Sequence, residues 1–177
     1  MTINRLVIRE SKPDEVDQVK KVLVDSYEQY ATILSVEQWE NYKNSIIDST
    51  ENSQTKTKLV ALVDNVMLGA CFIYDSAEKA YGLPDLEIKY PIVRLLGVSP
   101  KARGLGIATE LIRASCNLAQ EWGSDRIVLH TSDMMQSAIK LYEKLGFKRA
   151  KQYEFMNGKI LVKSYELTIN ETTLLTN

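Results

Sequence analysis

Apolar and polar positions alternate along this chain in two spacings, one typical of strands and one typical of helices. Short apolar runs flanked by turn residues predict strands, and apolar residues three or four positions apart predict helices. The predicted strands are at 6–8, 59–63, 67–74, 92–98, 126–130, 147–156 and 159–169. The predicted helices are at 11–27, at 36–47, from the glycine-rich run to 122, and at 137–145. A loop is predicted at 48–58 and an irregular stretch at 75–89.

Turn and capping residues support these boundaries. Asp64-Asn65 and Asn157-Gly158 stand between apolar runs, and such dipeptides favour tight β-hairpins. Ser11 is suited to cap the first helix. Gly123 and Gly146 stand where the helices before them should end, since glycine adopts the left-handed conformation of a helix C-terminus. The pattern therefore predicts two hairpins and four helices with defined ends.

The order of the elements predicts the fold class. Hairpins pair strands in antiparallel fashion, whereas strand-helix-strand units favour parallel neighbours. We therefore expect an α/β (α+β) fold, with a mixed, mostly antiparallel twisted sheet of about seven strands flanked by about four helices. The 177 residues favour one domain. Its predicted extent is 1–169, followed by a loose tail at 170–177.

Composition narrows the function classes. Hydrophobic residues make up 45% of the chain and charged residues 25%, with a net charge of −1, which is typical of a soluble globular protein. A basic surplus would indicate a nucleic-acid partner, and there is none. The N-terminal residues lack the pattern of a secretion signal and no run reaches a membrane span, so we expect a cytoplasmic protein without membrane contact. Cys71 and Cys116 lie in apolar patterns and are expected to be reduced core thiols.

The clearest chemical feature is the run Arg103-Gly104-Leu105-Gly106-Ile107-Ala108, which follows a strand and opens a helix. Short residues let the backbone approach a ligand closely, and the start of a helix presents unpaired N–H groups with a positive dipole end. This arrangement suits an anion such as a pyrophosphate. A plain tight turn explains the glycines equally well. The spacing fits neither a Walker loop nor a Rossmann fingerprint.

The run resembles the signature of the GNAT family of N-acetyltransferases, which is Gln or Arg, two residues, Gly, one residue, then Gly or Ala. The resemblance continues through Val98-Ser99-Pro100 before the run and through the segment Ala138 to Phe147 after it. It covers nearly the whole chain and implies a GNAT fold in which the strands ending at Val98 and near His130 splay apart to admit acyl-CoA.

The resemblance also implies binding residues for acetyl-CoA as a co-substrate. The backbone at Leu105, Gly106, Ile107, Ala108 and Thr109 would hold the pyrophosphate, with Arg103 and Gly104 in the same loop. Leu96 and Val98 would pair with the pantetheine arm, and the Val98 N–H would stabilise the thioester oxygen. No metal is required.

The resemblance implies that Tyr142 is the general acid that protonates the departing thiolate. A phenol has an ordinary pKa of about 10 and can donate to a sulfur that gains charge; core packing is the alternative role. Many relatives carry a glutamate base where this chain has Ile92. Glu87 and His130 are the candidate bases. The alternative for Glu87 is an exposed loop carboxylate, and the alternative for His130 is a structural role. Met135 replaces an asparagine that is frequent in the family.

The expected function is direct transfer of an acetyl group from acetyl-CoA to a primary amine in a ternary complex. The acceptor is a small-molecule or peptide amine, and a homodimer is plausible. Acidic residues such as Glu37, Glu40, Asp85 and Glu87 would favour a cationic acceptor, and a solvated surface explains them as well. A non-catalytic acyl-CoA-binding or regulatory module of the same fold is the alternative.

Overall fold

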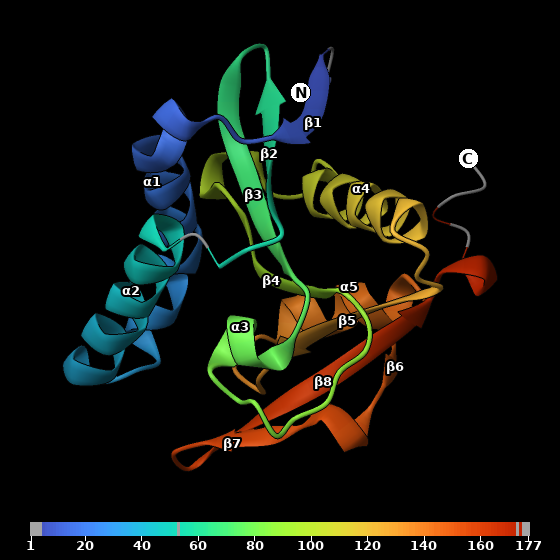
Figure 1. Ribbon diagram of the computed structural model, residues 1–177. Coiled ribbons are helices and arrows are strands. Elements are labelled where there is room, and N and C mark those ends of the chain that lie inside the picture. Colours follow the sequence, from blue (N-terminus) through green and yellow to red (C-terminus); the bar gives the residue numbers. More distant parts are fainter. Residues whose placement is uncertain (1–4, 53, 173, 175–177) are drawn as a thin grey trace. The chain divides into compact units, whose positions relative to one another are not determined.

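The computed structural model describes residues 5–52, 54–172 and 174 (Figure 1). In this part of the chain the helices are α1 (Val16–Tyr27), α2 (Val36–Glu51), α3 (Ala77–Tyr81), α4 (Ile107–Glu121) and α5 (Gln136–Lys144). The strands are β1 (Leu6–Glu10), β2 (Thr57–Val63), β3 (Val66–Tyr74), β4 (Ile92–Val98), β5 (Arg126–Thr131), β6 (Lys148–Arg149), β7 (Phe155–Asn157) and β8 (Ile160–Thr168).

The strands follow the order β1-β2-β3-β4-β5-β8-β6, with β7 paired to β8. β4 and β5 are parallel through Ile92–Val93, whereas β1–β2, β5–β8, β6–β8 and β7–β8 are antiparallel. The predicted mixed, mostly antiparallel sheet is confirmed. Among the described residues the sheet has eight strands, where about seven were predicted. The described part of the chain has five α-helices, where about four were predicted. The predicted splaying of the central strands stays a prediction.

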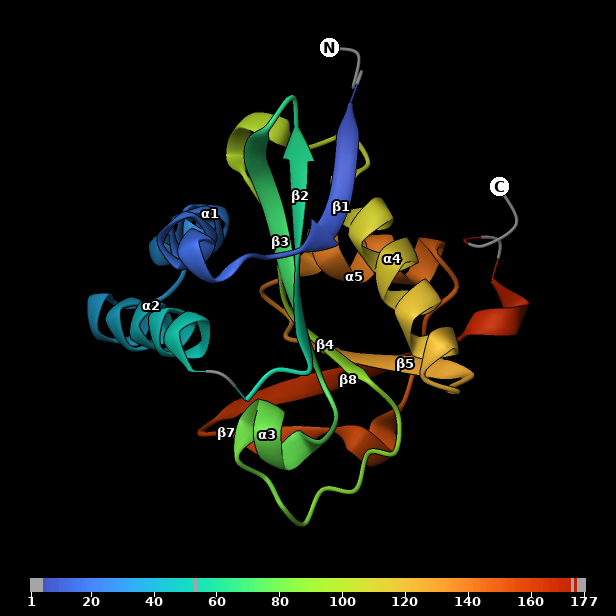
Figure 2. The same cartoon turned by 45° about the horizontal axis from the view of Figure 1, so that its top comes forward.

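The chain divides into two compact units, one formed by residues 1–72 and 95–112 and the other by 73–94 and 113–177. In the first unit, β2 and β3 form a hairpin whose turn residues, Asp64 and Asn65, have φ of 51° and 68°, as a type I′ turn requires. α1 and α2 lie side by side next to this hairpin (Figures 1 and 2). The fully buried side chains of the unit include Leu23, Ile46, Val60, Phe72, Ile107 and Leu111.

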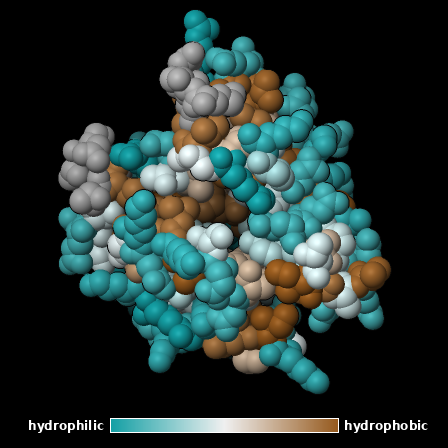
Figure 3. Space-filling model, turned by 180° about the vertical axis from the view of Figure 1, so that it is seen from behind, coloured by the Kyte–Doolittle hydropathy of each residue, from teal (hydrophilic) through white to brown (hydrophobic). Residues whose placement is uncertain are grey.

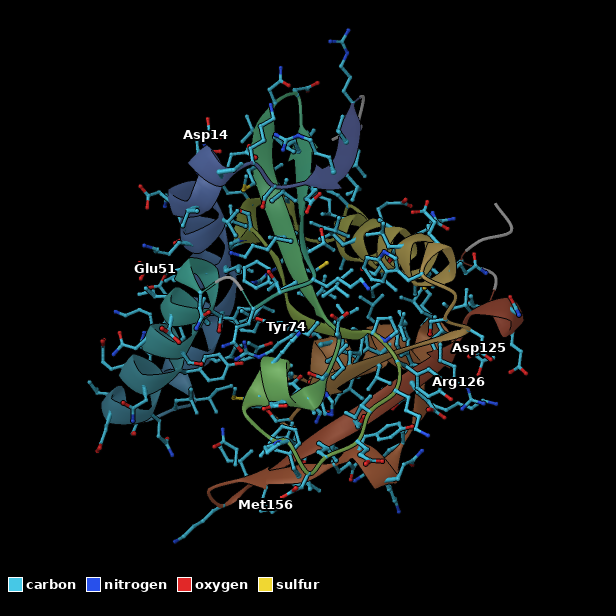
Figure 4. All side chains as sticks on the ribbon, in the orientation of Figure 1. Asp14, Glu51, Tyr74, Asp125, Arg126 and Met156 are labelled. Atoms are coloured by element: carbon cyan, nitrogen blue, oxygen red, sulfur yellow. The ribbon has the colours of Figure 1, made fainter. Side chains whose placement is uncertain are left out.

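In the second unit, β5 is central to its sheet because Ile127, Val128 and Leu129 are all buried, whichever face they point to. Its six pairs with β8 form a long ladder. α5 buries Ile139 and Tyr142 and exposes its other face, the spacing expected of an amphipathic helix. Figure 4 shows Asp125 and Arg126 where β5 begins and Met156 in β7.

The N-terminal half of the prediction needs two corrections at helix ends. Ser11 does not cap the first helix: its N–H donates to the Lys58 carbonyl, and a 3-10 turn, Pro13–Glu15, leads into α1. α2 continues to Glu51, so the predicted loop at 48–58 is wrong for its first residues. The helix extends because Thr50 is buried and its carbonyl accepts a hydrogen bond from the Lys58 ammonium at 2.8 Å. Figure 4 labels Glu51 at this helix end and Asp14 before α1.

The predicted irregular stretch at 75–89 contains a helix that the sequence analysis missed. α3 begins after Ser76, whose hydroxyl accepts from the Lys79 N–H, and ends at Gly82 with φ of 68°. Both features are ordinary helix signals, and the short length of the helix concealed them from a periodicity argument.

The predicted strand at 147–156 is broken. β6 ends at Arg149, a 3-10 turn follows, and β7 begins at Phe155. Ala150, between the two strands, is buried. The Arg149 guanidinium donates two hydrogen bonds, of 2.7 and 2.8 Å, to the Glu154 carboxylate, and these bonds stabilise the bend. The predicted hairpin is confirmed, but its two-residue turn is shifted by one position: Asn157 pairs with Ile160, so the turn residues are Gly158 and Lys159, with Gly158 at φ of 61°.

The predicted tail at 170–177 begins with packed residues. Thr172 and Leu174 are buried, and the Thr172 hydroxyl donates to the Leu145 carbonyl. Residues 173 and 175–177 lie outside the described residues, and the domain boundary at 169 stays a prediction. The predicted burial of both cysteines is confirmed.

On the face shown in Figure 3 the surface is mostly hydrophilic, and hydrophobic residues show in separate patches. None of the described helices combines the length and apolar character that crossing a bilayer demands.

Candidate functional site

The glycine loop leaves open space in front of a helix start. Gly104 and Gly106 have φ of 79° and 81°, a conformation that favours glycine. A Cβ built on either residue would meet no atom within 4 Å. α4 begins at Ile107, and its first turn is closed by a hydrogen bond of 3.1 Å from the Glu110 N–H to the Gly106 carbonyl. The loop therefore presents the N-terminal N–H groups of α4 beside space that a ligand can fill.

Packing within the first unit fixes the start of α4. Ile107 and Leu111 are buried, at 1% and 0% exposure. A Cβ on Gly69 of β3 would lie 3.0 Å from the Ile107 side chain and 3.3 Å from that of Leu111. Because residue 69 is glycine, the first turns of α4 rest directly on the backbone of β3.

Arg103 ties the same loop to α1. Its guanidinium donates to the Ser26 carbonyl at 2.6 Å, in the last turn of that helix. The side chain of this predicted binding residue is thus engaged with protein.

The end of β4 presents main-chain groups on two different edges. The Ser99 N–H donates to the Leu68 carbonyl at 2.8 Å, and the Gly97 carbonyl oxygen lies 3.3 Å from the Cβ position of Gly69. Positions 97 and 99 therefore face β3. Because successive residues of a strand point their N–H and C=O groups to opposite edges, those of Leu96 and Val98 point away from β3.

Two features of this segment were missed by the sequence analysis. Leu95, in the middle of β4, has φ of 55°, which is rare for a residue other than glycine. The Tyr27 hydroxyl donates to the Leu96 carbonyl at 3.1 Å. Nothing in the sequence marks Leu95, and Tyr27 gave only the signal of an apolar helix position.

In the second unit, Tyr142 lies on the buried face of α5, with 6% of its surface exposed. Its ring packs at 5.7 Å from the ring of Phe147, and its carbonyl accepts a hydrogen bond from the Phe147 N–H. The segment predicted from the resemblance thus folds as one piece, a helix followed by a buried aromatic anchor.

His130 is held by hydrogen bonds on both ring nitrogens. Nε2 lies 3.0 Å from the Tyr153 carbonyl oxygen, which can only accept, so we assign the proton to Nε2. Nδ1 then accepts from the Tyr81 hydroxyl, also at 3.0 Å. The rings of Tyr81, His130 and Phe155 pack with centroids 4.9 to 5.4 Å apart. Burial lowers the pKa of His130 to about 4, so the imidazole is neutral.

The second unit also has a pocket of about 520 Å³ between α5 and β8. Charged side chains at its wall include Asp133 and Lys163, which form an ion pair. The residues that line it include none of the predicted site residues.

A profile of the acetyltransferase (GNAT) family matches residues 16–147. The chain belongs to the acetyltransferase (GNAT) family. It is 31% identical to human N-acetyltransferase 8B over 131 residues, which are 69% of this chain and 55% of that protein. It is 27% identical to N-alpha-acetyltransferase 30 of Schizosaccharomyces pombe over 142 residues, 79% of this chain and 81% of the relative. N-acetyltransferase 8F1 of Mus musculus is 32% identical, and this chain spans little more than half the length of the two mammalian relatives.

Solved structures show the same GNAT fold. The PaiA N-acetyltransferase from Thermoplasma acidophilum, in complex with coenzyme A, superposes with a TM-score of 0.67 at 18% identity, covering 92% of this chain and 99% of that one. Aminoglycoside 6′-acetyltransferase type Ii superposes with a TM-score of 0.64 at 18% identity, covering 92% and 97%.

As a GNAT family chain, this protein departs from the expected pattern at two positions, Ile92 and Met135. Ile92, where many relatives carry glutamate, is fully buried. Glu87 is exposed, and Met135 is half-buried at the residue before α5. Across the described residues, histidine, cysteine and carboxylate side chains form no group of three that could hold a metal ion.

Proposed function

We propose that this protein transfers an acetyl group from acetyl-CoA to a primary amine. The observation that carries the proposal is the glycine loop of a GNAT family chain, whose left-handed Gly104 and Gly106 leave open space before the start of α4. The curated relatives are named as N-acetyltransferases, and one structure of the same fold is a complex with coenzyme A.

The residues present fit the co-substrate. The backbone N–H groups from Leu105 to Thr109 would hold the pyrophosphate, because a helix start attracts anions. The main chain of Val98, turned away from β3, would pair with the pantetheine amides as an added strand. The Leu96 carbonyl already accepts from Tyr27, so we assign the pairing to Val98 first.

The proposed reaction forms one C–N bond and breaks one C–S bond. The neutral amine attacks the acetyl carbonyl carbon, and the Val98 N–H donates to the oxygen on which negative charge develops. The nitrogen gives up one proton, and the departing sulfur receives one. The products are an N-acetylamine and the free thiol of coenzyme A.

Tyr142 is the proposed proton donor to the sulfur. A phenol ordinarily has a pKa of about 10, above that of a thiol, so donation is favourable as the sulfur gains charge. The place of Tyr142 on the buried face of α5 holds the ring in one orientation.

The contacts of His130 do not support a role as the base. Its lone pair already accepts from Tyr81, and its pKa of about 4 makes it a weak proton acceptor. Glu87 is exposed and is the candidate that remains; it would act through water. We propose that the amine proton leaves to solvent by this route.

A primary amine of a small molecule or of a peptide is the proposed acceptor. The relative from S. pombe is named an N-alpha-acetyltransferase, and a structure of the same fold is named an aminoglycoside 6′-acetyltransferase. We also propose a cytoplasmic location and a homodimer. The dimer is supported by the exposed hydrophobic residues of the β7–β8 hairpin, Met156, Ile160 and Leu161, because a second copy of the chain could cover them.

A non-catalytic acyl-CoA-binding module is the second candidate, favoured by the buried Ile92 in place of a glutamate. Thiol release from acetyl-CoA with spermidine, kanamycin, Nα-acetyl-lysine amide and a heptapeptide with a free N-terminus separates the two. Turnover with any of them supports the enzyme. Acetyl-CoA binding in calorimetry without turnover supports the module, and absence of binding contradicts both.

Replacing Tyr142 with phenylalanine tests the proposed acid. We expect kcat to fall about 100-fold, because general acid catalysis contributes on that order, while acetyl-CoA affinity changes little. Steady-state kinetics and calorimetry measure the two quantities. Unchanged kcat would remove Tyr142 from the reaction.

A further inference from the structure

The pocket between α5 and β8 has an apolar floor. Ile139 of α5, Phe147 and Tyr165 of β8 form it, and they are buried, at 7%, 3% and 5% exposure. The volume of about 520 Å³ lies within the range of small-molecule pockets, about 300–1,000 Å³. All of the lining residues belong to the second compact unit, and none of them is assigned above to acetyl transfer. The pocket is therefore not accounted for by the proposed function.

α5 and β8 run in the same direction along the pocket. Asp133, just before α5, forms an ion pair with Lys163 of β8. Gly146, just after α5, lies beside Leu167, because a Cβ on this glycine would be 3.5 Å from the Leu167 side chain. The pocket thus has one end at Lys163, beside the start of α5, and another beside the last turn of α5.

The Lys163 end of the pocket is positive. Arg149 of β6 pairs with Tyr165, two residues from Lys163, so both cationic side chains lie on the face that borders the pocket. Among the described residues no side chain caps the start of α5, and the helix dipole adds positive potential there. The pKa of Arg149 is raised first by its hydrogen bonds to Glu154 and, among weaker causes, by the negative charge of Asp133. The carboxylate of Asp133 therefore lies near both cations, at a position suited to an anion.

The other end of the pocket is negative. Gln136, Ile139 and Glu143 lie on one stripe of α5, and Glu143 is seven residues beyond Gln136, roughly 10 Å along the axis. Glu143 is exposed, and no side chain in the described part of the chain pairs with its carboxylate. Lys148 also lines the pocket, but it pairs with Glu166 and directs its side chain to the opposite face of the sheet. The C-terminal end of the helix dipole adds to the negative potential.

We propose that this pocket binds a short zwitterionic peptide, with its carboxylate at the Lys163 end and its ammonium at the Glu143 end. An extended tripeptide spans roughly 10 Å, which matches the separation along the α5 stripe. The ligand carboxylate takes the place of Asp133 at Lys163. This exchange costs little, because the Asp133 side chain is 70% exposed and exposed ion pairs are weak. The pocket needs no acetyl-CoA for this binding, so the inference does not rest on the proposed function.

Titration of the whole chain with the peptide Gly-Phe-Gly, followed by backbone-amide NMR, tests the positive end. We expect saturable shifts in α5 and β8. Lys163→Met should raise Kd about 5-fold, the value of one exposed charge pair. Asp133→Asn should lower Kd by a similar factor, because it removes the competing carboxylate, and a misfolded variant would not bind more tightly. Lys140→Met is the matched control, since Lys140 is an exposed lysine of α5 outside the pocket.

Blocked forms of the same peptide test its orientation. The N-acetylated form has no ammonium, so it should bind about 5-fold more weakly than Gly-Phe-Gly and should not respond to Glu143→Gln. The C-terminal amide has no carboxylate, so it should also bind more weakly and should not respond to Lys163→Met. Gly-Phe-Gly itself should respond to both substitutions.

Three results would overturn the inference. One is the absence of a saturable shift in the wild type. Another is binding that Lys163→Met, Asp133→Asn and Glu143→Gln all leave unchanged, since the peptide would then lie elsewhere on the protein. The third is equal affinity for the free and the blocked peptides. The thiol-release assay described above reports only on acetyl transfer, so the failure of either proposal is seen separately.

Discussion

The glycine loop and the His130 cluster use their polar groups in opposite ways. In the loop, Gly104 and Gly106 bear no side chain, and the space beside them is open. In the cluster, formed by Tyr81, His130, Tyr153 and Phe155, both imidazole nitrogens have protein partners and the rings pack on one another. The loop leaves open space beside a helix start, whereas the polar groups of the cluster are bonded to one another.

This difference shows that the residue type alone does not predict which groups can act on a ligand. Histidine has the ordinary pKa best suited to a base at neutral pH, and glycine has no titratable group. Burial lowers the pKa of His130 and two hydrogen bonds occupy both of its ring nitrogens. Positive φ and a helix start, by contrast, are features that suit the glycine loop to an anion. Three substitution experiments test the contrast, and each has an internal control.

The largest effect is expected at the loop, from Gly106→Ala. A Cβ there enters the open space and also strains a backbone at φ of 81°. Acetyl-CoA affinity should fall about 100-fold, which corresponds to about 3 kcal/mol. Gly82→Ala is the matched control, because Gly82 has φ of 68° and equally open surroundings. Calorimetry on both variants decides; equal affinities would mean that the loop binds no phosphate.

The cluster should respond to acid. The folded pKa of His130, about 4, is below its ordinary value of 6.5, so the unfolded chain binds a proton first as pH falls. The contribution of the neutral His130 to the free energy of unfolding is complete above about pH 6.5 and is lost as pH falls toward 4. At about pH 4.5 the loss is about 2.5 kcal/mol. Urea unfolding of wild type and His130→Gln at about pH 7.5 and about pH 4.5 measures this. An equal loss in both proteins would show that His130 is not the titrating group.

A smaller effect is expected at Gly97, a β4 glycine that faces protein instead of open space. A Cβ there would lie 2.2 Å from the Ser26 hydroxyl oxygen and 3.1 Å from the Leu23 side chain. Gly97→Ala should lower the free energy of unfolding by about 2 kcal/mol, as overpacking does. Adding Ser26→Gly removes the closest contact and should restore part of the loss. A double variant no more stable than the single one would show that Ser26 is not the obstacle.

Much of the fold could be predicted because local patterns and packing agree. β2, β3 and their Asp64-Asn65 turn, β4, and α5 all have the apolar spacing that their burial requires. The errors lie where a distant contact decides. α2 runs past 47 because Lys58 reaches the Thr50 carbonyl, and the strand predicted at 147–156 bends because Arg149 pairs with Glu154.

The sequence by itself determined the family, the glycine loop and the position of Tyr142 on a helix, because these depend on residues that are neighbours in the chain. Only the tertiary structure decided which side chains are already engaged. It showed that Arg103 holds Ser26, that His130 is bound on both nitrogens, and that Tyr27 reaches the Leu96 carbonyl from 69 residues away. A hydrogen bond between distant segments leaves no periodic trace in the sequence, because it fixes two positions and constrains nothing between them.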